Sequence, residues 1–351
     1  MPATPSMVSI EGLSKAIEGV WHLRKLFPSS LAWFVLKQSG RGNQMGRPLR
    51  MLEASAIYLA TIRCLQGRLF LRPSRETYDV LGGVLARAVR LHGVELFAFT
   101  FASNHLHLIV RAPQGNLPQF MQYLLTNISK KVGALVRWRG AFWERRYAAQ
   151  PLLDEAALLE KVRYVLAHGV KEGLVRRCSE WPGLSALPLM RDGNPRTFRW
   201  MNWTRRCRSA PASRRGPPLD ERWAEPEELR LTTLPIRGFD RLNVVRQFLD
   251  DCVHAIEEQA RLTYRKVMGA QSVCDQYPQR RPARPDRSPA PWCHTTIQRL
   301  KEEFLERYRS FASEFLEASA AWRAGNLGAR FPVTAVRPFL WPGQVPIANR
   351  A

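Results

Sequence analysis

Two apolar stretches that follow each other almost without a gap constrain the fold more than any other feature of this sequence. Residues 94–102, VELFAFTFA, and residues 105–112, HLHLIVRA, are rich in leucine, aromatic and β-branched residues, which predicts two strands. The short link between them cannot hold the dozen or more residues that a parallel crossover requires. We therefore expect an antiparallel hairpin, and with it a sheet that is at least partly antiparallel.

Periodic patterns on both sides of the hairpin predict helices that pack on this sheet. Strand patterns lie at 54–65 and 147–153, and helical patterns lie at 74–93, 117–138 and 154–175. Ser74 and Asp154 are the expected N-caps of the first and last of these helices. Strands and helices in this order predict an α+β fold, an antiparallel sheet with packed helices, over residues 50–190.

Composition divides the rest of the chain into three parts. Residues 1–49 are expected to form an N-terminal helical segment and a linker. Residues 191–235 contain many arginines, with no acidic residue between 196 and 218, and are expected to be a basic linker. Residues 236–351 show helical periodicity, interrupted by an Arg/Pro-rich stretch, and predict an α-helical C-terminal region.

The charge of the chain indicates a polyanionic partner. Lys and Arg number 53 against 30 Asp and Glu, a formal net charge of +23. Nucleic acid is the first candidate for this partner, and an anionic membrane surface is the second. The alternative is that no such partner exists and that the basic surface reflects an arginine-rich composition. No apolar run approaches the ~20 residues of a transmembrane helix, and no signal-peptide pattern is present. Six scattered cysteines without a CxxC pair favour a reduced, cytoplasmic protein.

The second strand of the hairpin places two imidazoles on one face. Side chains alternate along a strand, so His105 and His107 point the same way. Each buried imidazole needs a polar partner. The pair is either structural, with each imidazole hydrogen-bonded to a partner in the fold, or it provides two ligands for a metal ion. The second interpretation requires a third ligand from elsewhere in the fold.

The helical pattern at 154–175 offers both a third ligand and a nucleophile. Tyr164 and His168 are four residues apart and share a helix face. The alternative is that Tyr164 is one more aromatic residue of that face. A phenol, with a pKa near ~10, attacks phosphorus usefully when a divalent ion polarises the phosphate. The rival tyrosines Tyr147 and Tyr123 have no metal-ligand residue at this spacing.

These stretches resemble a known family. SNHLHLIV resembles the HUH motif (His, bulky apolar residue, His), and YVLAHGVKEGLV resembles the tyrosine helix of IS200-like single-tyrosine transposases, in particular those associated with repeated extragenic palindromes (REP). The resemblance covers residues 50–190. It implies an HUH domain with a ferredoxin-like palm, His105 and His107 as metal ligands, and Tyr164 as the nucleophile. It also implies a 5′-phosphotyrosine intermediate, a single-stranded or hairpin DNA substrate, and a homodimer.

One position departs from the family pattern. The third ligand of the family is usually a Gln or Asn four residues after the tyrosine, and here it is His168, with Gly169 where the family has Pro. The resemblance implies a divalent ion, Mg²⁺ or Mn²⁺. Three nitrogen ligands would favour Mn²⁺ or a softer ion over Mg²⁺, which prefers oxygen.

Basic residues flank this site in the sequence, with Trp138, Phe142 and Trp143 among them. Cations that follow phosphates, mixed with aromatic rings that stack on bases, are typical of single-strand binding, and a solvated helix end with core tryptophans is the alternative. The candidate DNA-binding residues are Lys130, Lys131, Arg137, Arg139, Arg145 and Arg146.

The sequence thus predicts a metal-dependent HUH endonuclease and strand transferase that acts in DNA transposition. The alternative is a catalytically inactive or domesticated DNA-binding protein of the same fold, because of His168 and the long C-terminal region. An RNA phosphoesterase with two His-x-Ser/Thr motifs is disfavoured, because the matching letters at 294–296 lie outside the predicted domain.

Overall fold

The computed structural model describes residues 49–209, 221–283 and 291–335. The expected N-terminal helical segment and linker, residues 1–49, lie outside the described residues except for Leu49. All elements below belong to the unit that begins at Arg50.

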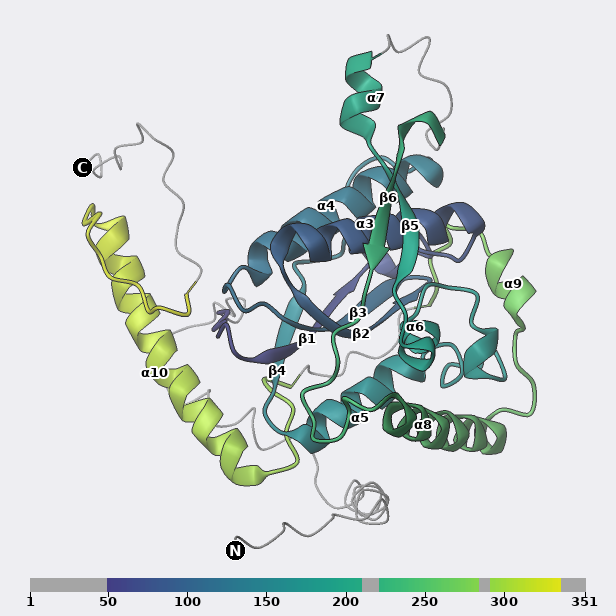
Figure 1. Cartoon of the computed structure of the whole chain (residues 1–351). Coiled ribbons are helices and arrows are strands. Elements are labelled where there is room, and N and C mark those ends of the chain that lie inside the picture. The colour runs from purple at the N-terminus through teal and green to yellow at the C-terminus, as the bar shows by residue number, and fades with distance from the viewer. Residues whose placement is uncertain (1–48, 210–220, 284–290, 336–351) are drawn as a thin grey trace, which may run out of the picture. The chain divides into compact units, whose positions relative to one another are not determined.

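A four-stranded antiparallel sheet forms the centre of this unit (Figure 1). Its strands are β1 (Ile57–Arg63), β2 (Glu95–Ala102), β3 (His105–Arg111) and β4 (Ala148–Leu152), in the order β2-β3-β1-β4. Helix α3 (Arg75–His92) connects β1 to β2, and α4 (Leu117–Leu135) connects β3 to β4. This β-α-β-β-α-β arrangement is ferredoxin-like, and it confirms the α+β class and the antiparallel hairpin.

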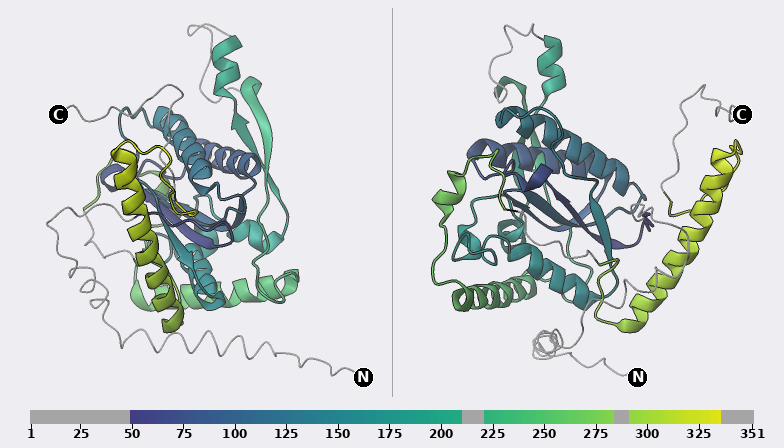
Figure 2. Two further views of the ribbon diagram at one scale, coloured as in Figure 1. Left: turned by 90° about the vertical axis from the view of Figure 1, so that its left-hand side faces the viewer. Right: turned by 180° about the vertical axis from the view of Figure 1, so that it is seen from behind.

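The two faces of the sheet carry different helices. Helices α3 and α4 pack on each other and cover one face, and α5 (Glu155–Leu166) lies on the other (Figures 1 and 2). Ser74 caps α3 by accepting a hydrogen bond from the Thr77 N–H, and Asp154 caps α5 by accepting one from the Ala157 N–H. Both caps agree with the expected N-caps.

The last helix of the domain is shorter than its periodicity predicts. The helical pattern extends to residue 175, but α5 ends at Leu166 and residues 167–174 form turns. Gly169 has a φ of +92°, which a helix cannot contain, and a Cβ at this residue would lie 2.5 Å from Trp181 Cε3. His168 therefore lies just beyond the helix, in the turn that Gly169 makes.

The expected basic linker at 191–235 is corrected by the structure. Within it, β5 (Arg196–Met201) and β6 (Ala224–Leu229) pair as an antiparallel ribbon that packs on α3. Phe198 and Trp200 are buried and alternate with the exposed Thr197 and Arg199, which is the strand period of two. The abundance of arginine and the absence of acids hid this period from the sequence interpretation. Residues 210–220 of the segment lie outside the described residues.

Two adjacent glycines in the middle of α3 allow the ribbon to approach. A Cβ at Gly83 would lie 2.2 Å from the Arg199 carbonyl oxygen, and one at Gly82 would lie 2.0 Å from Phe198 Cδ1. Both distances are far below any van der Waals contact, so only glycine is compatible with this close packing.

Replacing Gly83 by Ala should lower the free energy of unfolding by up to about 2 kcal/mol. Overpacking costs about 1–3 kcal/mol, and the better helix propensity of Ala offsets about 1 kcal/mol of this. Gly133→Ala in α4 is the matched control, because its Cβ would lie 3.6 Å from the nearest atom, the Trp138 carbonyl oxygen, and it should raise stability by about 0.5–1 kcal/mol. Urea unfolding measures both, and equal stability of the two variants would contradict the close packing of the ribbon.

Later segments of the chain cover both outer strands of the sheet. Along β2, the Phe101 N–H donates to the Leu184 carbonyl and the Ala186 N–H to the Phe99 carbonyl, each at 2.9 Å. Along β4, His294 exchanges two backbone hydrogen bonds of 2.9 Å with Pro151 and Leu153. Covered edges do not pair readily with another chain. The homodimer that the family resemblance implies would therefore need a surface other than the sheet edges.

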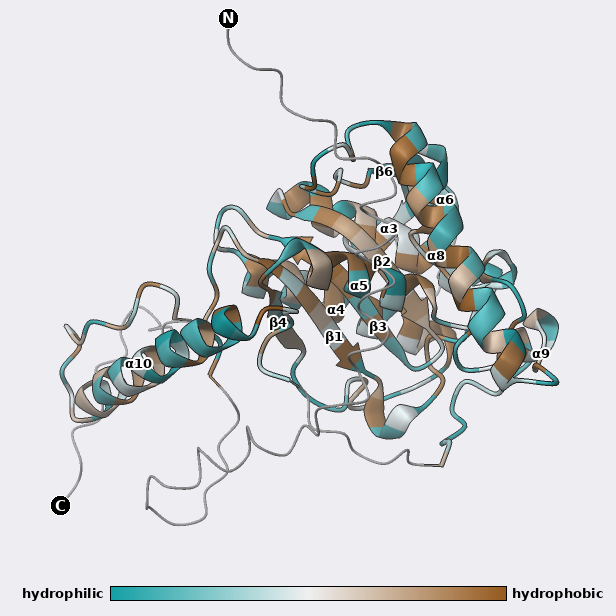
Figure 3. Ribbon diagram, turned by 90° about the horizontal axis from the view of Figure 1, so that it is seen from below, coloured by the Kyte–Doolittle hydropathy of each residue, from teal (hydrophilic) through white to brown (hydrophobic). Residues whose placement is uncertain are grey.

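The described part of the C-terminal region contains the helices α8, α9 and α10. Helix α8 (Leu242–Thr263) packs against α5 and α6 (Leu187–Asp192) through a buried stripe that includes Leu249, Cys252 and Ile256. In Figure 3, the sheet strands are mainly apolar, whereas α10 shows mainly polar residues in the same view. The remaining helices and 3-10 turns are α7 (Trp203–Ser209), α9 (Ala270–Cys274), α10 (Gln298–Arg323), η3 (Leu65–Gly67), η4 (Cys178–Glu180) and η6 (Glu221–Trp223). Within the described ranges, every helix is too short or too polar to serve as a membrane span.

Candidate active site

Three imidazoles converge at one end of the sheet. His105 and His107 come from β3, and His168 comes from the turn after α5. Their ring centroids are 4.9 Å apart for His105 and His107, 5.0 Å for His105 and His168, and 4.5 Å for His107 and His168. One ring nitrogen of each lies within 4.8 Å of the others. The structure thus brings together the three residues that the sequence predicted as metal ligands.

The chemistry of this cluster fits a divalent cation. Both ring nitrogens of His107 are buried and have no hydrogen-bond partner among the described residues. Buried nitrogens without a partner are costly, and a metal ion would satisfy one of them. Burial, with a further contribution from His168, lowers the pKa of His107 well below its usual range and that of His105 to about 3. Both imidazoles are therefore neutral at neutral pH, which is the form that binds metals.

A carboxylate lies behind the third imidazole. Glu172 Oε1 is 3.1 Å from His168 Nδ1, although the pair lacks hydrogen-bond alignment, and Glu172 Oε2 accepts a hydrogen bond from the Gly169 N–H. Burial would raise the pKa of the Glu172 carboxyl, but His168, Lys171 and the Gly169 N–H outweigh it and hold this pKa at about 2. Carboxylates in this position orient metal-binding imidazoles and set their tautomer, which would leave Nε2 of His168 for a ligand.

The sequence interpretation missed Glu172 and its neighbour Lys171. The Lys171 ammonium lies 3.2 Å from His168 Nε2 and 3.4 Å from the centroid of the Tyr164 ring. Burial lowers the pKa of Lys171 to about 8, although Glu172 opposes the shift. The signal for Glu172 was present in HGVKEG, where it follows His168 by four residues.

Glu172→Gln should weaken Mn²⁺ binding by about 10–100-fold, because the neutral amide orients the imidazole of His168 less strongly than a carboxylate does. Isothermal titration of Mn²⁺ into the DNA-free protein measures this affinity. Glu155→Gln, an exposed change in the first turn of α5, is the control and should leave the affinity unchanged. Equal affinities for wild type and Glu172→Gln would show that the carboxylate has no such role.

Tyr164 lies in the last turn of α5, against the histidines. Its ring centroid is 5.3 Å from that of His107 and 5.2 Å from that of His168, and 39% of the residue is exposed. Burial of the remainder, and to a smaller extent Glu172, raises the pKa of the phenol. The phenol therefore holds its proton at neutral pH, while its exposed part remains accessible to a substrate.

The rival tyrosines lie in other surroundings. Tyr147 is buried with its ring under the Arg50 guanidinium, 3.7 Å from the ring centroid. The Tyr123 ring lies between those of His92 and Trp200, at centroid distances of 5.7 and 6.2 Å. These positions favour Tyr164 over both alternatives.

The predicted DNA-binding residues divide into two groups. Lys131 is buried, donates a hydrogen bond of 2.6 Å to the Met201 carbonyl and lies over the rings of Trp200 and Trp203. It joins α4 to the β5-β6 ribbon, so its assignment to DNA binding is corrected. The others, Lys130, Arg137, Arg139, Arg145 and Arg146, are exposed.

The loop that carries most of these arginines begins after α4 and ends beside the histidines. The Glu144 N–H donates to the Arg63 carbonyl at 2.9 Å, and Arg63 is the partner of His105 across the sheet. The aromatic residues of the loop pack inward, because Trp138 and Phe142 contact the buried Phe70. These contacts favour the alternative interpretation, in which the rings pack in the core, over the expectation that they stack on bases.

Comparisons with known proteins give one family match. Residues 68–167 match the family model described as transposase, IS200 like, a stretch that contains His105, His107 and Tyr164. The comparison with curated proteins gives no significant match. Among solved structures, the chain is similar to a REP-associated tyrosine transposase bound to a REP hairpin, at 19% identity, with a TM-score of 0.36, covering 40% of this chain and 82% of the other.

A second solved structure, described as a transposase from Deinococcus radiodurans R1, has 19% identity, a TM-score of 0.25 and coverage of 36% of this chain and 95% of the other. Both structural similarities are too low to support a functional argument. The family match rests on the sequence of residues 68–167, and these residues include the sheet hairpin, α4 and α5. Residues 68–167 of this chain are therefore similar in sequence to the IS200-like transposases.

Proposed function

We propose that this chain is a metal-dependent HUH endonuclease and strand transferase, of the REP-associated type, that cuts single-stranded or hairpin DNA through Tyr164. The observation that carries the proposal is the packing of a partly exposed phenol against His107 and His168, two buried members of a cluster of three imidazoles. The similarity of residues 68–167 to the IS200-like transposases supports DNA as the substrate. The exposed arginines Arg137, Arg139 and Arg145 would hold the strand at the same end of the sheet.

His105, His107 and His168 would hold the metal ion. A site with three nitrogens favours Mn²⁺ over Mg²⁺, although both are within the range of the proposal. When bound, such an ion withdraws charge from the non-bridging oxygens of the scissile phosphate.

Tyr164 would carry out the covalent step. Its Oη attacks the phosphorus, the bond between phosphorus and the 3′ oxygen breaks, the phenol loses its proton and the departing 3′ oxygen gains one. The products are a 5′-phosphotyrosine and a free 3′-hydroxyl. One phosphoester bond replaces another, so the reverse reaction needs no external energy, which suits strand transfer. The Lys171 ammonium, 3.4 Å from the ring centroid, would stabilise the negative charge that develops on the phenol oxygen.

A covalent complex on a denaturing gel tests the proposal. The full chain is incubated with end-labelled hairpin DNA and Mn²⁺ or Mg²⁺, and a labelled band at the mass of the protein plus DNA is expected. If the protein shifts the DNA in a native gel but forms no covalent band with either ion, the enzymatic proposal is wrong. A DNA-binding protein of the same fold would then remain.

A further inference from the structure

Arg63, the last residue of β1, lies beside the histidine cluster. It is the partner of His105 across the β1-β3 pair, and directly opposed residues of antiparallel strands project their side chains from the same face of the sheet. The His105 ring is in turn 5.0 Å from the His168 ring, measured between centroids. The Arg63 side chain therefore begins on the face of the sheet that carries the candidate active site, at the His105 end of the cluster.

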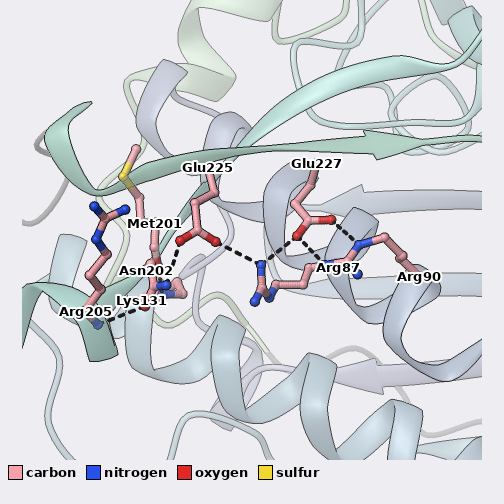
Figure 4. Close-up of polar contacts among 8 residues, drawn as sticks. All are labelled: Arg87, Arg90, Lys131, Met201, Asn202, Arg205, Glu225 and Glu227. Atoms are coloured by element: carbon pink, nitrogen blue, oxygen red, sulfur yellow. Dashed lines mark hydrogen bonds and ion pairs between the residues drawn. The ribbon is translucent and has the colours of Figure 1, made fainter.

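The Arg63 guanidinium has no acidic partner among the described residues. On the other side of the sheet the arginines of α3 are paired, because Arg87 and Arg90 face Glu225 and Glu227 (Figure 4). The Nε atom of Arg63 is buried and makes no hydrogen bond within the described part of the chain, whereas the residue as a whole is half-buried. A guanidinium can donate two parallel N–H groups to one phosphate, so a bound phosphate would supply both the missing charge and the missing acceptors.

Contacts with the backbone and with a neighbouring amide hold this guanidinium in place. It packs on Gly67, where a Cβ would lie 2.7 Å from Arg63 Nη2. The Gly67 carbonyl accepts a hydrogen bond of 3.1 Å from Asn104 Nδ2, and Asn104 Oδ1 lies 2.6 Å from His105 Nδ1. The surface under the guanidinium is thus connected to the histidine cluster. A side chain that is already ordered loses little conformational entropy when it binds an anion.

Arg63 and Tyr164 lie at different ends of the cluster. The Tyr164 ring contacts the rings of His107 and His168, whereas Arg63 is the cross-strand partner of His105. Beyond Arg63, its carbonyl accepts a hydrogen bond of 2.9 Å from the N–H of residue 144, and residue 145, an arginine, is exposed. The cations therefore begin at the end of the cluster opposite to Tyr164 and continue into the loop that precedes β4.

The proposed covalent step gives the bound strand a direction. In a phosphoryl displacement, the attacking and leaving oxygens lie in line on opposite sides of the phosphorus. When the phenol oxygen of Tyr164 attacks, the departing 3′ oxygen therefore points away from Tyr164, toward the end of the cluster where Arg63 lies. The nucleotide that carries this 3′ oxygen is then the one that lies next to the guanidinium.

We propose that Arg63 binds the phosphate immediately 5′ of the scissile phosphate. The inference rests on the proposed function, because the direction of the strand follows from attack by Tyr164. This contact holds the strand that carries the new 3′-hydroxyl close to the phosphotyrosine. In the reverse step the 3′ oxygen attacks the phosphorus and loses its proton, the bond between phosphorus and the phenol oxygen breaks, and the phenol regains a proton.

A neutral methylphosphonate in place of single phosphates tests the contact. The full chain is incubated with Mn²⁺ and end-labelled hairpin DNA below saturation, and the length of the labelled fragment gives the position of the cut. In the wild type, a methylphosphonate immediately 5′ of the scissile phosphate should slow adduct formation about tenfold, as expected for the loss of one charge-assisted contact. Arg63→Gln should slow it about tenfold on unmodified DNA, and the methylphosphonate should cause no further loss, because the two changes remove the same contact.

Arg111→Gln is the matched control. Arg111 lies on the same face at the other end of β3, where its Nε donates to Glu95 at 2.6 Å, and the substitution removes the same charge. This variant should keep the wild-type rate and the tenfold methylphosphonate effect. Thermal melting of both variants confirms that the fold is intact, and the effect in the wild type does not depend on any variant.

Two results would each overturn the inference while leaving the proposed function intact. One is a wild-type rate that the methylphosphonate does not change, which would show that nothing reads this phosphate. The other is a methylphosphonate effect that persists undiminished in Arg63→Gln, which would show that another residue binds it. A wild type that forms no adduct at all would instead refute the proposed function, and the inference with it.

Discussion

Tyr164→Phe should abolish the covalent protein–DNA complex and leave hairpin binding unchanged. The substitution removes the phenol oxygen but keeps the ring that packs on His107 and His168 and under the Lys171 ammonium. Loss of a nucleophile lowers the rate of a covalent step on the order of 10⁴-fold or more, so the band should fall below detection. A denaturing gel measures the adduct, and a native gel with the same labelled hairpin measures binding.

Tyr147→Phe is the matched control for this experiment. Its hydroxyl is buried and has no hydrogen-bond partner among the described residues, so the same atom can be removed without breaking a contact. The adduct should persist in this variant at the wild-type level. A covalent band in Tyr164→Phe, or its loss in Tyr147→Phe, would mean that the nucleophile has been assigned to the wrong tyrosine.

His107→Leu should abolish the stabilisation of the DNA-free protein by Mn²⁺, which we call its Mn²⁺ response. At a concentration of 100 Kd, the ion should raise the unfolding free energy of the wild type by about 2.7 kcal/mol, because it binds only the folded state. The variant removes a central ligand of the cluster, so its melting temperature should be the same with and without the ion. Differential scanning calorimetry, with and without Mn²⁺, measures the effect without any reaction.

The metal-free stability of the same variant provides a second readout. Both ring nitrogens of His107 are buried without a partner, and replacing such a group by an apolar one of similar size is nearly neutral or stabilising. His107→Leu should therefore melt at or above the wild-type temperature in the absence of the ion. His254→Leu, an exposed change on α8, controls for the loss of an imidazole and should keep the Mn²⁺ response. If His107→Leu also keeps it, the histidines do not form the metal site.

Errors in the sequence interpretation arose where packing overrides composition. The stretch at 196–201 contains two arginines and no acid, which is typical of a solvated linker, yet Phe198 and Trp200 are buried against α3. Lys131 belongs to a run of cations, but the ribbon covers it and engages its ammonium. In both cases a segment distant in sequence decided the burial, and no local pattern reports such a contact.

The structure shows the expected arrangement of the candidate site residues where the evidence for it was local. The hairpin, the shared face of His105 and His107, and the proximity of Tyr164 to His168 follow from a tight turn, from strand alternation and from a spacing of four residues. Each of these relations spans few residues and depends only on backbone geometry. The sequence by itself could therefore determine the parts of the site and their order along the chain.

The tertiary structure alone decided how those parts meet. Which sheet face α5 covers depends on the packing of apolar residues far apart in sequence, and this placed Tyr164 against the histidines of β3 and not behind them. The same packing positioned Lys171 and Glu172 around His168, covered the sheet edges and placed the β5-β6 ribbon on α3. These features arise from long-range burial, in which many weak contacts act together, and no spacing along the chain encodes them.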